Sequence, residues 1–113
     1  MRLVRRSLST VYLKRRTVTY DEEGEEMTTY VDEPIEFKML VQSAGGRVDA
    51  QIYGARLPYI KSCKYQGELL KPVQNELDGV CVYVDKTDEP DYRIIDIQPY
   101  TDHLNVTLER ING

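Results

Sequence analysis

The sequence predicts a mainly β protein, a small β-barrel or sandwich of six to seven strands with one short helix. Three observations lead to this class. Short stretches rich in Val, Ile, Thr and Tyr recur along the chain, several of them alternate apolar and polar residues, and turn-forming residues separate them. The length of 113 residues fits one domain with one modest core. We therefore predict a single domain over residues 1–113, with residues 1–8 as a flexible basic N-terminal arm.

A hairpin and a half-buried strand open the predicted fold. Residues 11–20 are rich in Val, Thr and Tyr and are predicted to form one strand. "DEEGEE" at residues 21–26 supplies a turn centred on Gly, and residues 27–31 return as a second strand. In "IEFKMLVQ", which follows Pro34, every second residue is apolar, so this stretch predicts a strand with one buried face. The apolar positions are Ile35, Phe37, Met39 and Val41.

The segment "SAGGRVDAQIYGARL" predicts the helix. Ser43 is a suitable N-cap, and Val48 and Ile52 lie one helical turn apart. Gly54 stands where a helix ends in the left-handed conformation. We expect a helix of two to three turns.

The second half of the chain predicts four more strands. Residues 58–65 form the first, and residues 66–79 form a loop with one helical turn near Leu69 and Leu70. The strand at residues 80–84 is apolar on both faces, which indicates a central position in the sheet. The hairpin turn that follows it is predicted at residues 88–91, which contain Pro90. The last two strands are predicted at residues 92–97 and 103–109.

Charge is distributed unevenly along the chain. The first sixteen residues hold six Lys or Arg and no acid, a charge of +6, whereas the remainder holds nine against nineteen acids, a charge of −10. This asymmetry indicates either a basic arm that binds an anionic partner or a solvated terminus. The anionic partner is a nucleic-acid backbone or an acidic protein surface. Seven acids between residues 21 and 33 place the hairpin tip in solvent or against a basic partner.

Reactive chemistry is sparse in the sequence. The single histidine, His103, is expected on the polar face of the last strand, and the acidic residues fall mainly at turns. Neither a GxSxG nor a GK[ST] motif is present. Cys63 and Cys81 lack a CxxC arrangement; free thiols are favoured, and a disulfide between them is left open. We expect no enzymatic activity, no cofactor and no metal. No apolar run approaches the roughly 20 residues of a membrane helix, so no membrane partner is expected.

The order of these elements resembles the small head–tail connector proteins of long-tailed bacteriophages, the head-closure or stopper family. The resemblance lies in "TVYLKRRTVTYDEEGEEMTTYV", "IEFKMLVQSAGGRVDAQIYGARL" and the closing "GVCVYVDKTDEPDYRIIDIQPYTDHLNVTLERI". It covers about residues 8–111. The closest similarity is to prophage connectors of Gram-positive hosts.

The resemblance implies a β-barrel made in the cytoplasm of a bacterial host and incorporated into the neck of the virion. There the family assembles as a ring, usually of twelve subunits, between the portal or adaptor protein and a tail protein. Packaged double-stranded DNA occupies the channel, and in stopper members a loop closes it. The family has no catalytic or metal-binding residues to transfer to this chain.

Two groups of residues are candidates for this role. The segment between Ser43 and Leu57 is the candidate channel loop by position, and the tip at residues 21–26 is its rival. We expect the arginines of the N-terminal arm to face a protein neighbour, and the acidic hairpin to supply a complementary surface. The candidate interface residues are Arg2, Arg5, Arg6, Arg15, Arg16, Asp21, Glu22, Glu23, Glu25 and Glu26, and the candidate loop residues are Ser43, Gly45, Gly46, Arg47 and Asp49.

Two other functions remain open from the sequence. One is another part of the neck or tail, a tail terminator or an adaptor. The other is an oligonucleotide-binding-type barrel, in which the basic arm and tyrosines would bind a single strand. For the second, "YIKSCKY" is the only strip that combines aromatic and basic residues.

Overall fold

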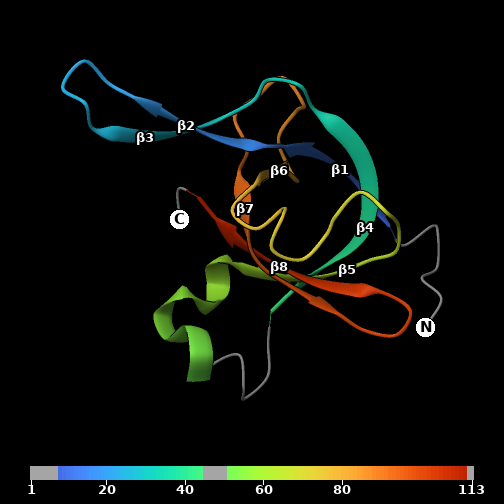
Figure 1. Cartoon of the computed structure of the whole chain (residues 1–113). Helices are drawn as coiled ribbons and strands as arrows, with labels where there is room; N and C mark the ends of the chain where they lie inside the picture. The colour runs from blue at the N-terminus through green and yellow to red at the C-terminus, as the bar shows by residue number, and fades with distance from the viewer. Residues whose placement is uncertain (1–7, 45–50, 112–113) are drawn as a thin grey trace.

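A closed antiparallel barrel of six strands forms the body of the protein, in the order β1-β4-β5-β8-β7-β6 (Figure 1). The structure is a computed structural model that describes residues 8–44 and 51–111. Among these residues, the strands β2 and β3 pair with each other alone and form a separate two-stranded sheet. The mainly β class and the barrel are therefore confirmed. The barrel strands are β1 (Ser9–Lys14), β4 (Ile35–Ser43), β5 (Ile60–Tyr65), β6 (Gly79–Cys81), β7 (Tyr92–Pro99) and β8 (Leu104–Arg110), and the hairpin strands are β2 (Arg16–Tyr20) and β3 (Glu26–Tyr30).

Alternating side chains fill the barrel. On β4 the predicted inward residues Phe37 and Met39 are buried, because every second residue of a strand faces the same side. The Phe37 ring packs edge-on against Tyr65 with 5.6 Å between ring centroids. Leu70, from the connection between β5 and β6, is buried in the same core. The other fully buried large side chains are Val11, Leu13, Ile60, Cys63, Val80, Cys81, Ile94, Val106 and Leu108.

The predicted single strand at residues 11–20 is wrong, because the chain changes sheets at Arg15. β1 pairs with β6 as far as Lys14 opposite Gly79. Beyond that point the Arg16 N–H donates to the Asp78 carboxylate at 2.9 Å, in place of a continued backbone ladder. The Arg15 carbonyl instead accepts from the Val31 N–H at 2.8 Å. A side chain thus ends the barrel strand and starts the hairpin.

The predicted strand at residues 80–84 is too long, since β6 ends at Cys81. The Asp91 carboxylate accepts hydrogen bonds from the Val82 N–H at 2.8 Å and the Tyr83 N–H at 3.0 Å. These bonds occupy the donors that a longer ladder would use. The three residues of β6 are all buried between β1 and β7, in agreement with the predicted central position.

The loops differ from the prediction in detail. Between β6 and β7 the backbone turn falls at residues 85–88, where the N–H of Asp88 donates to the carbonyl of Asp85 at 2.9 Å, rather than at residues 88–91. The connection at residues 66–78 contains turns at residues 72–77 and no helical turn near Leu69 and Leu70.

The predicted short helix is confirmed, whereas its cap and its end differ from the prediction. Residues 51–53 are α-helical and lead into a 3-10 helix, η2 (Gly54–Tyr59). Ser43 does not cap a helix, because it is the last residue of β4 and pairs with Lys61. Gly54 has the predicted left-handed conformation, with φ of 54°, but the chain continues as η2, so the next strand begins at Ile60 rather than residue 58. In the described part of the chain, none of the helices is long and apolar enough to cross a membrane.

Candidate interaction surface on the β2–β3 hairpin

The β2–β3 hairpin projects from the barrel as an arm (Figure 1). Its ladder runs from Arg16 opposite Tyr30 to Tyr20 opposite Glu26. Tyr20 is 70% exposed and Met27 47% exposed, although both are large and apolar. A two-stranded sheet is marginally stable alone, so this arm depends on its attachment to the barrel.

An aromatic contact stabilises the foot of the hairpin, the end next to the barrel where Arg16 pairs with Tyr30. The Tyr30 ring packs so closely on Gly79 that a Cβ added there would lie 2.9 Å from its Cδ1 and 2.5 Å from Cγ of Pro90. Only glycine therefore fits between these two rings. Burial raises the pKa of the Tyr30 phenol, against the opposing effects of the Arg93 and Arg16 charges. The phenol stays neutral at physiological pH.

A buried hydrogen-bond network joins the same foot to the connection between β5 and β6. Asp78 is 6% exposed, and its carboxylate accepts from the Arg16 N–H and from Asn75 Nδ2, the latter at 3.0 Å. Asn75 Oδ1 in turn accepts from the Lys71 N–H at 2.8 Å. The hairpin therefore leaves the barrel in a fixed direction.

Lys14, the last residue of β1, makes a second connection between the hairpin and the barrel. Its side chain is 5% exposed, and Nζ donates to the Asp88 carbonyl at 2.7 Å and to the Asp32 carboxylate at 3.2 Å. Asp32 belongs to the segment after β3, and Asp88 to the connection between β6 and β7. One ammonium group thus ties the hairpin's return to a barrel loop.

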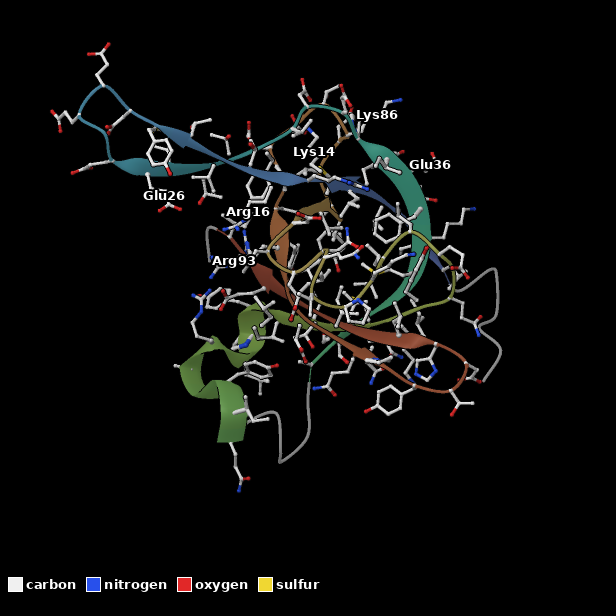
Figure 2. The ribbon with its side chains drawn as sticks, in the orientation of Figure 1. Lys14, Arg16, Glu26, Glu36, Lys86 and Arg93 are labelled. Carbon is white, nitrogen blue, oxygen red and sulfur yellow. The ribbon has the colours of Figure 1, made fainter. Side chains whose placement is uncertain are left out.

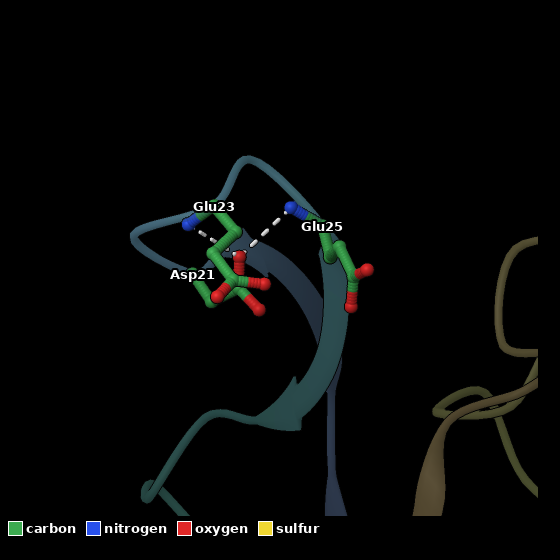
Figure 3. Close-up of side chains that lie close together, drawn as sticks. All are labelled: Asp21, Glu23 and Glu25. Atoms are coloured by element: carbon green, nitrogen blue, oxygen red, sulfur yellow. Dashed lines mark hydrogen bonds between the residues drawn. The ribbon is translucent and has the colours of Figure 1, made fainter.

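The tip of the hairpin carries closely spaced carboxylates (Figure 3). Asp21 Oδ1 accepts from the Glu23 N–H at 2.9 Å and from the Glu25 N–H at 2.8 Å, and Gly24 supplies the left-handed turn residue with φ of 81°. Carboxylate oxygens of Asp21, Glu23 and Glu25 lie within 4.8 Å of one another. These like charges make the tip strongly electronegative.

Cations gather at the opposite end of the arm. A surface hollow at the foot of β2 is lined by Arg15, Arg16 and Lys71, together with Glu68, Leu69, Gln74, Asn75 and Asp78. Figure 2 shows Arg16 near Arg93 at the foot and Glu26 farther along the hairpin. The arm is therefore polarised, with arginines at the foot and carboxylates at the tip.

The structure places the predicted interface residues at two separate ends of the arm. Arg15 and Arg16 lie at the foot, whereas Asp21, Glu22, Glu23, Glu25 and Glu26 lie at or beside the tip. Arg2, Arg5 and Arg6 lie outside the described residues, as do the loop candidates Gly45, Gly46, Arg47 and Asp49. Ser43, the remaining loop candidate, ends β4, and its Oγ accepts from Lys61 Nζ at 3.3 Å.

The sequence analysis did not identify the residues that fix the direction of the β2–β3 hairpin. Tyr30 contacts Gly79, and Asp78 bonds the Arg16 N–H, only because the fold places the hairpin beside the start of β6. Their order in the sequence carries no periodic signal of this contact. The glycine in "LDGV" was available as a cue, since an isolated glycine near a strand can mark a close backbone approach.

The other candidate reactive groups have structural partners. His103 lies just before β8 with its side chain 10% exposed, and its ring nitrogens bond Asp102 at 2.7 Å and Asn105 at 3.0 Å. Its ring also stacks on Tyr100. Both cysteines are buried and free, as the sequence favours, and burial raises the pKa of the Cys63 thiol to about 12.

Comparison with known proteins supports the fold. No family model matches the chain, and no curated protein matches it. Among solved structures, the chain is similar to the solution structure of protein SF1141 from Shigella flexneri 2a, with 14% sequence identity and a TM-score of 0.60. The match covers 93% of each chain. Similarity at this identity extends to the fold alone.

Proposed function

We propose that this chain is a structural protein of the bacteriophage neck, a head-closure or head–tail connector subunit. It assembles as a ring, of twelve copies in the virion, between the portal or adaptor protein and a tail protein, and helps retain packaged double-stranded DNA. The proposal starts from the order of sequence elements that resembles this family. The structural observation that supports it most is the polarised arm on a closed barrel.

A ring subunit must present two different complementary surfaces, because a head-to-tail contact repeated around an axis closes into a circle. The hairpin carries surfaces of opposite charge at its foot and tip. The buried network at Asp78 fixes the direction of the arm, so an assembly contact made by it has a defined geometry. This favours a role in assembly over one in catalysis.

The carboxylates at the tip also suit a position beside DNA. Asp21, Glu23 and Glu25 repel phosphates, so a tip that faces the channel lets DNA slide without binding it. The arginines of residues 1–6 have the opposite effect on phosphates, and we place them against a protein neighbour. Deletion of residues 1–6 tests whether these arginines contact a protein neighbour or the DNA.

One strip that favoured the oligonucleotide-binding alternative is largely occupied within the fold. Within "YIKSCKY", Tyr65 is 5% exposed, its ring packs on Phe37 and its hydroxyl accepts from the Leu69 N–H at 2.9 Å. The Arg56 guanidinium covers the Tyr59 ring at 4.7 Å from its centroid. The Tyr65 ring is therefore buried away from any base, and one face of the Tyr59 ring is covered. Filter binding with single-stranded DNA tests the alternative directly, because tight, salt-sensitive binding would restore it.

A genetic experiment tests the proposed function. The gene is deleted from the phage or prophage genome that carries it, and the deletion is complemented with the wild-type chain or with Glu22→Lys/Glu23→Lys. We expect the deletion to yield separate tails and heads that lose DNA, wild-type complementation to restore virions, and the charge-reversed tip to restore them poorly. Normal virion yield from the deletion strain would rule the function out. A tail terminator would instead leave DNA-filled heads stable and tails of irregular length.

A further inference from the structure

We infer that the free protein forms a twofold-symmetric dimer in which the β2 strands of two copies pair antiparallel, with Val18 opposite Val18. The four hairpin strands then form one sheet in the order β3-β2-β2-β3. This inference concerns the isolated protein and does not depend on the proposed function in the virion.

Among the described residues, no strand pairs with the outer edge of β2, and beyond Arg16, whose N–H donates to Asp78, this edge is open. Its sheet has only two strands, and the arm stands clear of the barrel strands (Figure 1). The Arg15 carbonyl faces β3, since it accepts from Val31, whereas the Arg16 N–H faces away from β3 toward Asp78. Because backbone groups alternate along an antiparallel strand, the N–H and C=O groups of Arg16, Val18 and Tyr20 point to the outer edge.

This edge lacks the features that normally prevent strand addition. Natural edge strands are protected by lysine, proline or bulges. The outer half of β2, "TVTY", contains none of these and consists of residues that favour strands. Val18 is half-buried, and Thr17, Thr19 and Tyr20 are exposed. The edge is therefore a competent template for another strand.

The charge order along β2 selects a second copy in the antiparallel direction. Pairing about Val18 places Arg16 opposite Tyr20 and Arg15 opposite Asp21, at both ends of the contact. A parallel arrangement would place the carboxylate tips together and the arginine feet together, which is repulsive. Each acidic tip also approaches the hollow at the other copy's foot, lined by Arg15, Arg16 and Lys71. The same strand thus carries both halves of a complementary contact.

The backbone groups fit this register at Val18 and only in part at Arg16, whose N–H already donates to Asp78. The two Val18 residues form a hydrogen-bonded pair and exchange both of their N–H···O bonds. At each end the Arg16 carbonyl accepts from the Tyr20 N–H of the second copy. The Arg16 N–H keeps its bond to Asp78, so the Tyr20 carbonyl of the second copy bonds water instead, and each end of the contact has one backbone hydrogen bond. An extended strand rises about 3.3 Å per residue, so Asp21 lies roughly 17 Å along β2 from Arg16 and does not reach the foot of its own hairpin. The contact is therefore between copies.

A disulfide trap tests the register. A hydrogen-bonded antiparallel pair has Cα atoms about 5.5 Å apart, within the range of a disulfide, so Val18→Cys should cross-link two copies under mild oxidation. Thr28→Cys is the matched control, because Thr28 lies opposite Val18 on β3 and is exposed. The native Cys63 and Cys81 are buried. We expect cross-linking of Val18→Cys at least about tenfold faster than that of Thr28→Cys. Equal rates would overturn the inference.

Sedimentation of unmodified chains gives an independent test. The Val18 N–H points away from β3, so Val18→Pro removes an outer donor without removing a hairpin hydrogen bond, and Val18→Thr keeps the donor. Because the contact is small, association is measured at up to about 1 mM protein. We expect Val18→Pro to weaken dimerisation at least about tenfold, Val18→Thr to preserve it, and high salt to weaken it in the wild type. A monomeric wild type at this concentration, or an equally dimeric Val18→Pro, would contradict the proposed pairing and leave the virion role to its own test.

Discussion

Replacement of Asp78 by alanine should strongly destabilise the protein. Its carboxylate is 6% exposed and accepts from the Arg16 N–H at 2.9 Å and from Asn75 Nδ2 at 3.0 Å. A hydrogen bond to a charged group contributes about 1.5–3 kcal/mol. Arg16 is exposed and its N–H can bond water after the substitution, whereas Asn75 is 5% exposed and loses a partner in the interior. We therefore expect Asp78→Ala to lower the free energy of unfolding by about 2–4 kcal/mol.

Urea unfolding followed by far-UV circular dichroism measures this loss, and the melting temperature should fall by about 8–20 °C. Asp78→Asn is the matched control. Its side-chain oxygen can still accept from Arg16, but its amide group cannot accept from Asn75, so about half of the loss is expected. An Asp78→Ala variant within about 0.5 kcal/mol of the wild type would refute the argument that this carboxylate secures the hairpin's foot.

Four further predictions follow from particular contacts. Gly79→Ala should cost about 1–3 kcal/mol in urea unfolding, because the new Cβ would lie 2.9 Å from the Tyr30 ring; a neutral result would mean that the hairpin's foot shifts freely. The hydrogen bond from Arg93 holds the pKa of Glu109 below its ordinary value of 4.5, so its stabilising effect is present above that pH and is lost as pH falls below it. Glu109→Gln should therefore flatten the fall in stability below about pH 4.5, and an unchanged pH profile would contradict the pairing. The Cys63 thiol, with its pKa near 12, should react with a thiol reagent only after unfolding; rapid labelling of the native protein would show that the barrel opens. Deletion of residues 1–6 should reduce assembly on portal-bearing particles, whereas unchanged assembly with lost DNA retention would place that arm against DNA.

The barrel strands were predictable because their burial pattern is local. In "IEFKMLVQ" the alternation of apolar and polar residues identifies the inward face, and Phe37 and Met39 are indeed buried. The residues on either side of Arg15 have similar strand preferences, so the sequence offers no local reason for a break there. The break depends on Asp78, which lies 62 positions from Arg16 along the chain.

The candidate surface likewise has one part that the local sequence predicts and one part that depends on contacts between distant residues. The acidic tip is visible in the sequence as "DEEGEE", and its exposure follows from the turn that it forms. The foot of the arm required the fold, because Lys71 joins Arg15 and Arg16 only through the connection between β5 and β6. The change from basic to acidic residues along β2 could therefore be predicted from the sequence, whereas the hollow at the foot of the hairpin could not.

Cryo-electron microscopy of purified virions from the genome that encodes this chain tests the neck assignment most directly. The account predicts a ring of small barrels between portal and tail, with each β2–β3 arm in contact with a neighbouring protein or the channel. A neck built entirely from other chains, in particles that lack this protein, would contradict it.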